Sequence, residues 1–204
     1  ELDFSRLSEE QVSFLSRLTR ELLQSRYLPY PHERGDFSFR EKLSRFLQVY
    51  CHIKYDAEKL FVGPERIQLL EMILKMVLPK GGRLLLSESL KEVYGRLLDN
   101  NNCVGCYAND DLPEIFNLDD VLNPDIVLIA AKQFSRPSPL LLEALFQQAL
   151  KHPKRLYILD DSANFDIGSG LDSNITLRLA GQASVPSNLV FLYGLTKNTV
   201  CPDL

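Results

Sequence analysis

The sequence has few cysteines, no block rich in lysine or arginine and no long apolar run, and each absence excludes a class of protein. Four cysteines in 204 residues do not form a disulfide framework, so we expect a reducing, cytoplasmic setting. A net charge of −4 without a basic block argues against a nucleic-acid-binding surface. The longest apolar runs, such as residues 126–131, are far too short to span a bilayer. We therefore expect neither nucleic acid nor a membrane among the partners.

The remaining composition leaves room for a sizeable core. Hydrophobic residues make up 45% of the chain and charged residues 25%, as in ordinary globular domains. The sequence begins with Glu1 and shows no secretory leader, and we expect it to be a piece of a longer chain. Its length suits one domain, or one domain and part of another. We assign residues 1–35 to a helix with a proline-rich entry loop, and residues 36–204 to the main domain, which we expect to be truncated at its C-terminal end.

Apolar segments of two kinds alternate along the main domain. Short apolar runs predict strands, and longer stretches with helical spacing predict the helices between them. Two earlier helices are predicted to begin near Ser8, with a capping box, and after Asp36. This alternation predicts an α/β fold with a doubly wound, mostly parallel sheet and helices on both faces. Strands are expected at residues 60–62, 83–86, 103–107, 125–131, 155–159 and 188–193, with helices that open at Pro64 and span residues 89–98 and 139–150.

The residues that follow the strands form the candidate site, because ligands of such sheets bind beyond the carboxyl ends of the strands. Lys197 follows the last apolar strand, where a desolvated amine could form a Schiff base. Asp160 ends the strand before it and could pair with a pyridinium nitrogen. Gly63 could let backbone N–H groups approach a phosphate. The plain alternatives are a solvated loop lysine, an aspartate in a turn or helix cap, and a glycine in a tight turn.

The order of these elements resembles the large domain of fold-type-I pyridoxal-phosphate (PLP) enzymes of the aminotransferase class. Residues 30–43 are similar to the entry of the family's domain helix, and residues 60–63 to the strand before its phosphate loop. Asp160 stands where the family carries the aspartate of the pyridine nitrogen, and Lys197 where it carries the Schiff-base lysine. The resemblance covers nearly the whole chain and implies PLP as the family's cofactor.

The same comparison marks departures from a working cofactor site. Arg136 replaces the asparagine that contacts the cofactor's phenolic oxygen in the family, and no aromatic residue lies at positions 89–90 to stack on the ring. Pro64 removes an N–H donor from the phosphate loop. Glu65 would repel a phosphate unless Arg66 offsets its charge. The residues that would line what remains of the site are Lys197, as a vestigial Schiff-base lysine, with Asp160, Gly63, Arg66 and Arg136.

A narrower resemblance, to the aminotransferase-like central region of methionine S-methyltransferases, rests on four motifs at residues 2–5, 27–30, 194–198 and 202–204. In that family an N-terminal methyltransferase domain binds S-adenosylmethionine, and the parent enzyme makes S-methylmethionine from methionine. The present segment has no glycine-rich strand-to-helix loop of an adenosylmethionine site. We therefore predict a non-catalytic module without a bound cofactor, whose partners are the rest of the parent polypeptide, including the methyltransferase domain, and further copies in a homo-oligomer.

Two other functions remain open. The chain could be a fragment of a working PLP-dependent class I/II aminotransferase, with Lys197 as the Schiff-base lysine and Asp160 as the partner of the ring. It could instead be an interaction scaffold, whose former cofactor cleft binds methionine or S-adenosylmethionine through Arg66 and Arg136.

Two further clusters suggest structural roles rather than a metal site. Cys103 and Cys106 have the spacing of metal ligands, but they fall in a predicted strand, so we predict buried free cysteines and no metal. The acidic residues between positions 110 and 120 predict a solvated helix face.

Overall fold

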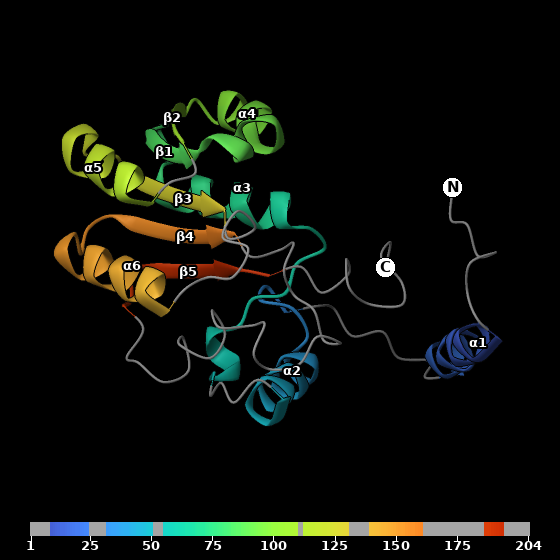
Figure 1. Ribbon diagram of the computed structural model, residues 1–204. Coiled ribbons are helices and arrows are strands. Elements are labelled where there is room, and N and C mark those ends of the chain that lie inside the picture. The colour runs from blue at the N-terminus through green and yellow to red at the C-terminus, as the bar shows by residue number, and fades with distance from the viewer. Residues whose placement is uncertain are drawn as a thin grey trace.

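The computed structural model describes residues 9–24, 32–50, 55–109, 112–130, 139–160 and 186–193. Within these ranges, five parallel strands form one sheet in the order β2-β1-β3-β4-β5 (Figure 1). From β1 the chain passes to β2 on one side and then to β3 on the other, so the direction of winding reverses between β1 and β3. The strands are β1 Arg83–Ser87, β2 Val104–Ala108, β3 Ile126–Ala130, β4 Leu156–Asp160 and β5 Leu189–Leu192.

Six α-helices and two 3-10 turns accompany the sheet in the described ranges. Helix α2 begins where the sequence predicts, because the Asp36 side chain accepts a hydrogen bond from the Phe39 N–H at 2.7 Å and caps the helix. Helix α3 begins at Arg66, two residues after Pro64. The helices are α1 Glu9–Gln24, α2 Phe37–Tyr50, α3 Arg66–Val77, α4 Lys91–Asn100, α5 Leu112–Leu122 and α6 Pro139–Lys151, with η2 Ala57–Lys59 and η3 Glu88–Leu90.

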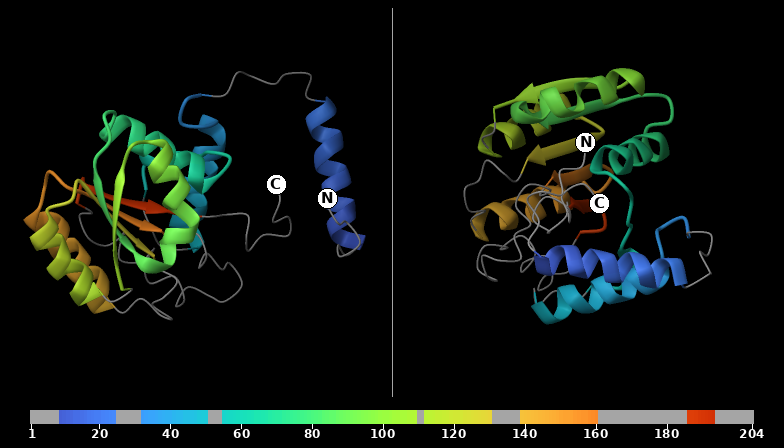
Figure 2. Two further views of the ribbon diagram at one scale, coloured as in Figure 1. Left: turned by 90° about the horizontal axis from the view of Figure 1, so that it is seen from above. Right: turned by 90° about the vertical axis from the view of Figure 1, so that its right-hand side faces the viewer.

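The helices cover both faces of the sheet, as expected for a doubly wound domain (Figure 2). One core cluster joins α3 and α4 to alternate strand residues such as Leu84, Leu86 and Ile158. The other joins α5 and α6 to residues of the opposite face, such as Leu85 and Tyr157. Every residue of β3 is buried, since this strand is covered on both sides. The predicted fold class is therefore confirmed.

The strand predicted at residues 60–62 is wrong. In the structure these residues belong to no strand, and the Val62 N–H donates to the Arg34 carbonyl at 2.9 Å instead of joining a ladder. A small apolar cluster around Leu47 of α2 includes Leu60 and Tyr193, which directly follows β5. Leu60 therefore packs beside α2 and the end of β5, whereas Phe61 is exposed, and none of the three residues has a place in the sheet.

None of the helices in the described part of the chain is long and apolar enough to cross a membrane. Helix α1 belongs to the predicted N-terminal extension, and residues 25–31 between it and the next described segment lie outside the description. The domain boundary at residue 35 therefore stays a prediction.

Two glycines, one in the turn before β1 and one inside α4, should change stability in opposite directions when replaced by alanine. Gly81 has φ +82°, and a Cβ atom there would lie 2.1 Å from the Asn102 carbonyl oxygen. Gly81→Ala should destabilise the fold by more than the ~1–2 kcal/mol of a left-handed backbone. A Cβ at Gly95, inside α4, would meet nothing nearer than the Tyr107 hydroxyl at 4.0 Å. Gly95→Ala should stabilise by about 1 kcal/mol, because alanine favours helices. Urea unfolding measures both, and shifts of equal sign would contradict this account.

Candidate functional site

The candidate site lies at the carboxyl ends of the strands, beside the point where the winding reverses. Asp160 is the last residue of β4, in register with Ala130 of β3 and Leu192 of β5. The Ser87 hydroxyl at the end of β1 accepts a hydrogen bond from the Ala130 N–H at 3.2 Å, so it ties β1 to β3. Asp160 is only 4% exposed. A carboxylate buried to this degree needs hydrogen-bonding or charged partners.

Two side chains from different helices provide those partners. The Tyr94 hydroxyl of α4 donates to Asp160 Oδ2 at 2.6 Å, and Arg66 Nη1 at the start of α3 lies 3.3 Å from the same oxygen. The Arg66 guanidinium also covers the Tyr94 ring, with Cζ 5.8 Å from the ring centroid. We name Asp160, Tyr94 and Arg66 the Asp160 cluster. It joins one strand to both helices of the α3/α4 face.

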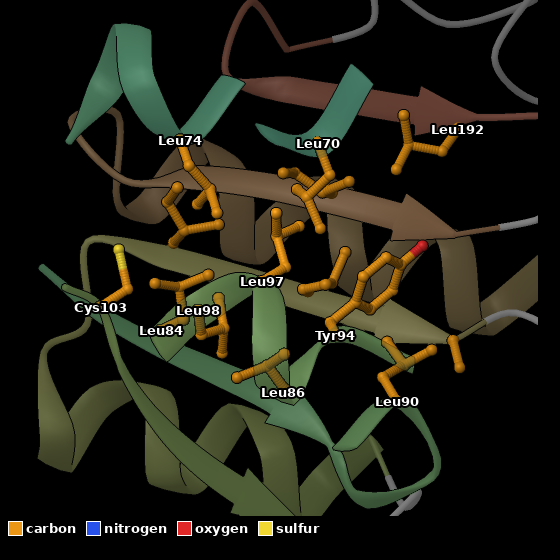
Figure 3. Close-up of a cluster of buried hydrophobic side chains, with 14 residues drawn as sticks. Leu70, Leu74, Leu84, Leu86, Leu90, Tyr94, Leu97, Leu98, Cys103 and Leu192 are labelled. Carbon is orange, nitrogen blue, oxygen red and sulfur yellow. The ribbon is translucent and has the colours of Figure 1, made fainter. Parts of the chain in front are cut away.

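Tyr94 acts in this cluster as a neutral donor. Its ring is buried among the leucines of the α3/α4 face, with the hydroxyl beside the end of β4 (Figure 3). Burial raises the pKa of Tyr94 far above its ordinary value of 10.0, and the charge of Asp160 and the hydrogen bond to it raise it further. The Arg66 charge opposes this rise without cancelling it. The phenol therefore keeps its proton at any physiological pH and holds the carboxylate.

Of the residues predicted for the site, the structure brings Asp160 and Arg66 into contact. Gly63 lies three residues before Arg66. A Cβ atom at position 63 would come within 2.7 Å of the Leu69 Cδ2 atom. Its missing side chain thus allows close packing against α3, and a role toward a phosphate stays a prediction. Lys197 and Arg136 lie outside the described residues, and their places in the site also stay predictions.

Tyr94 was not predicted as a member of the site, although the sequence carries a signal for it. Leu90, Tyr94 and Leu98 follow one another at four-residue spacing and are all buried, so Tyr94 lies on the core face of α4. A tyrosine on a core face brings a hydroxyl that must find a partner. That rule predicts a buried acceptor near Tyr94 without identifying it as Asp160.

The described residues do not fit a PLP ring as they stand. The carboxylate that would pair with the ring nitrogen already binds a phenol and a guanidinium through its Oδ2 atom. At the start of α3, Glu65 makes no side-chain capping bond and is exposed, and Pro64 before it has no N–H. The phosphate would therefore meet a negative charge and one donor fewer.

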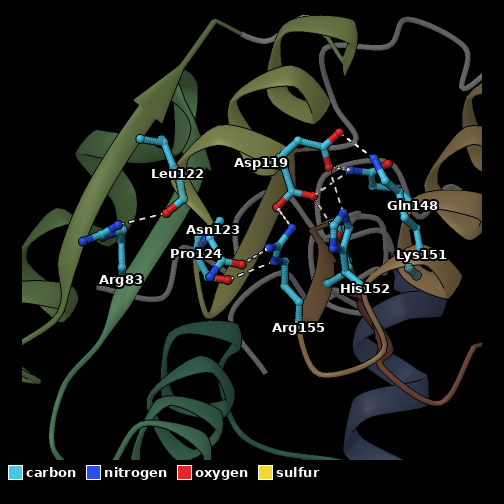
Figure 4. Close-up of polar contacts among 12 residues, drawn as sticks. Arg83, Asp119, Leu122, Asn123, Pro124, Gln148, Lys151, His152 and Arg155 are labelled. Carbon is cyan, nitrogen blue, oxygen red and sulfur yellow. Dashed lines mark hydrogen bonds and ion pairs between the residues drawn. The ribbon is translucent and has the colours of Figure 1, made fainter.

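A second buried carboxylate lies at the opposite, amino end of β4. Asp119 of α5 is fully buried, and its Oδ1 is 2.5 Å from Arg155 Nη1 (Figure 4). Its Oδ2 accepts hydrogen bonds from the Tyr157 hydroxyl at 2.7 Å and from Gln148 Nε2 at 2.9 Å. The prediction that this acidic stretch is a solvated face is therefore wrong for Asp119, because Asp119 lies on the side of α5 that packs into the α5/α6 core. It is correct for Asp120, which is exposed.

Asp120 contacts Lys151 at 2.6 Å and His152 at 2.8 Å on the outside of the same region. The hydrogen bond from Lys151, followed by that from His152, lowers the pKa of Asp120 from 3.8 to about 2. Asp119, Asp120 and His152 each offer a ligand atom within 4.8 Å of the others. Oδ1 of Asp119 already binds Arg155, and its Oδ2 binds Tyr157 and Gln148, so the arrangement is that of an ion-pair network.

Cys103 is buried, and burial raises the pKa of its thiol.

Comparisons with known proteins give sequence relatives of one kind. No protein-family model matches the chain. The methionine S-methyltransferase of Zea mays is 26% identical over 217 residues, with 99% of this chain and 20% of the relative covered. Those of Wollastonia biflora and Hordeum vulgare are 23% and 25% identical over 97% and 99% of this chain, and 19% of each relative is covered. The chain thus spans about a fifth of the length of these relatives.

Solved structures give the fold. Escherichia coli YbdL, described as having a methionine aminotransferase function, matches with a TM-score of 0.69 and 14% identity over 90% of this chain and 49% of that one. Aminotransferase AspB from Helicobacter pylori matches with a TM-score of 0.68 and 16% identity over 97% and 54%. Thermus thermophilus aspartate aminotransferase with maleate matches with a TM-score of 0.64 and 18% identity over 96% and 50%. The chain is therefore similar over nearly its whole length to a segment of methionine S-methyltransferases, and it has the fold of the PLP-dependent aminotransferases.

Proposed function

We propose that this chain is the aminotransferase-like, non-catalytic module of a methionine S-methyltransferase. One observation carries the non-catalytic part: the Asp160 carboxylate is bound by Tyr94 and Arg66, which are part of the chain itself. A pyridine ring nitrogen needs that carboxylate as its partner. With Oδ2 of the carboxylate engaged, the fold would keep the form of a cofactor domain without this electrostatic contact.

The proposal for the parent enzyme rests on the sequence similarity. Three methionine S-methyltransferases match 97–99% of this chain, each over about a fifth of its own length. The parent would transfer a methyl group from S-adenosylmethionine to the methionine sulfur and so give S-methylmethionine. That reaction would belong to a separate methyltransferase domain of the same polypeptide. The module would act in the cytoplasm as a structural or oligomeric part, with the rest of the polypeptide as its partner.

A second candidate is a PLP-dependent aminotransferase that uses Lys197 as the Schiff-base lysine. It is favoured by the burial of Asp160 at the carboxyl end of a parallel strand, where the ring partner of such an enzyme belongs. This candidate requires PLP to displace Arg66 from Asp160.

Absorbance spectroscopy separates the two candidates. The full polypeptide that carries this chain is mixed with PLP, freed of excess by gel filtration and scanned above the protein band. We expect no Schiff-base band that depends on Lys197. A band present in the wild type and absent in Lys197→Ala would contradict the non-catalytic proposal, and another lysine of the same polypeptide, Lys80, provides the matched control variant.

A further inference from the structure

Helix α3 carries both methionines of the chain, and both are exposed. The sequence has two methionines in 204 residues, Met72 and Met76. Met72 is 47% exposed and Met76 is 76% exposed. Side chains four residues apart are neighbours on a helix surface, so the two thioethers share one face of α3. Methionine is among the residues most often fully buried, so this pair is an exception that calls for a reason.

The other side of α3 holds the helix in the core. Leu70 and Leu74 are fully buried there, among the side chains that pack α3 against the sheet (Figure 3). Next to the methionines in sequence, Glu71 and Lys75 form an ion pair of 2.8 Å with exposed side chains. The methionine face of α3 is therefore in contact with water, and a change of polarity on it would leave the buried contacts of the helix in place.

We propose that Met72 and Met76 form a paired oxidation site, at which a hydroperoxide such as hydrogen peroxide gives methionine sulfoxide while the fold stays intact. In each step the thioether sulfur attacks one oxygen of the peroxide, the O–O bond breaks and an S–O bond forms. The proton of the attacked oxygen passes to the leaving hydroxide, which departs as water. The sulfur is thus oxidised and the peroxide reduced. Exposure makes the site, because the oxidant reaches the sulfur from water.

Oxidation would change the surface of α3 rather than its core. A sulfoxide is polar, whereas a thioether is apolar. The exposed apolar surface of the helix, which also includes Ile67 and Val77, would shrink to those two side chains. A methionine sulfoxide reductase with a dithiol reverses the change and gives thioether, disulfide and water. The pair can therefore record an oxidising episode and be reset, and this role is independent of the proposed function.

Peptide mapping by mass spectrometry tests the site. The full polypeptide that carries this chain is treated with hydrogen peroxide, digested and sampled over time, in the folded state and in guanidinium chloride. We expect Met76 to be oxidised about as fast in the folded state as in the denaturant. Met72 is less exposed and should react more slowly than Met76. Protection of both residues by about tenfold or more in the folded state would overturn the proposal.

Leu74→Met provides the matched control. It places a third thioether on the same helix at a fully buried position, with little change in volume. Its sulfur should be oxidised at least about tenfold more slowly than that of Met76, since it is reached only when the helix opens. Equal rates would contradict the role of exposure. Circular dichroism verifies that the variant is folded, and Leu70→Met, which is equally buried, replaces it if it is not.

Hydrogen exchange of the α3 peptides shows whether the fold survives oxidation. We expect the same exchange before and after peroxide treatment, and a sulfoxide reductase with dithiothreitol should restore the original peptide masses. Faster exchange of α3 in the oxidised wild type, absent from a variant with both Met72→Leu and Met76→Leu, would overturn the proposal, because oxidation would then open the helix.

Discussion

Asp119→Ala is expected to lower the free energy of unfolding by about 3–5 kcal/mol, the range for breaking a buried ion pair from one side. The change leaves the Arg155 guanidinium buried without the carboxylate that lies 2.5 Å away. It also removes the acceptor of the Tyr157 hydroxyl and of Gln148. Unfolding in guanidinium chloride, followed by circular dichroism, measures the loss.

The next residue provides a matched control. Asp120→Ala removes the same charge from the same helix, but Asp120 is exposed, and we expect little change in stability at neutral pH. Because its pKa is lowered, its contribution is present above pH 3.8 and is lost as the pH falls toward about 2. Equal losses for Asp119→Ala and Asp120→Ala at neutral pH would contradict the role of the buried network.

Arg40→Met is expected to lower stability by about 3–6 kcal/mol, from two hydrogen bonds of a charged donor at about 1.5–3 kcal/mol each. Arg40 of α2 is 1% exposed. Its Nε donates to the Gly35 carbonyl at 3.2 Å and its Nη1 to the Ala57 carbonyl at 2.6 Å. Methionine fills a similar volume but leaves both carbonyls without this donor, and α2 then loses its polar attachment to η2.

The effect of Arg40→Met should be local as well as global. Amide hydrogen exchange should speed up first in α2 and η2, while the strands exchange more slowly. Arg45→Met serves as the control, since Arg45 lies on the same helix and is exposed. A loss in Arg45→Met that matches the loss in Arg40→Met would rule out the buried contacts as the cause.

The sequence predicts the sheet well because its strands are short apolar runs between amphipathic helices. Five of the six expected strands appear within a few residues of their predicted bounds. At the exception, residues 60–62, only Leu60 joins the cluster beside α2, and Phe61 is exposed. An apolar run of only three residues is too short to distinguish a strand from a connection between elements.

The candidate site is predicted less completely, because its contacts join residues far apart in the chain. Asp160 could be found from its place at a strand end, and Arg66 from its place after a predicted loop. That the two meet across 94 positions follows only from the folded topology. Asp119 lies four residues after Ile115 on the core face of α5, so helical spacing carried a signal that the acidic composition around it obscured.

The two ion-pair clusters have a joint consequence for strand β4. Side chains alternate along a strand, so Tyr157 faces the α5/α6 layer while Asp160 faces the α3/α4 layer. A slip of β4 by one position against β3 would turn each of these polar groups toward the wrong layer, Asp160 away from Arg66 and Tyr157 away from Asp119. A misaligned β4 would therefore leave charged and polar side chains without their partners and would also expose leucines. The contacts of the two carboxylates thus favour the native pairing of β4 while the chain folds.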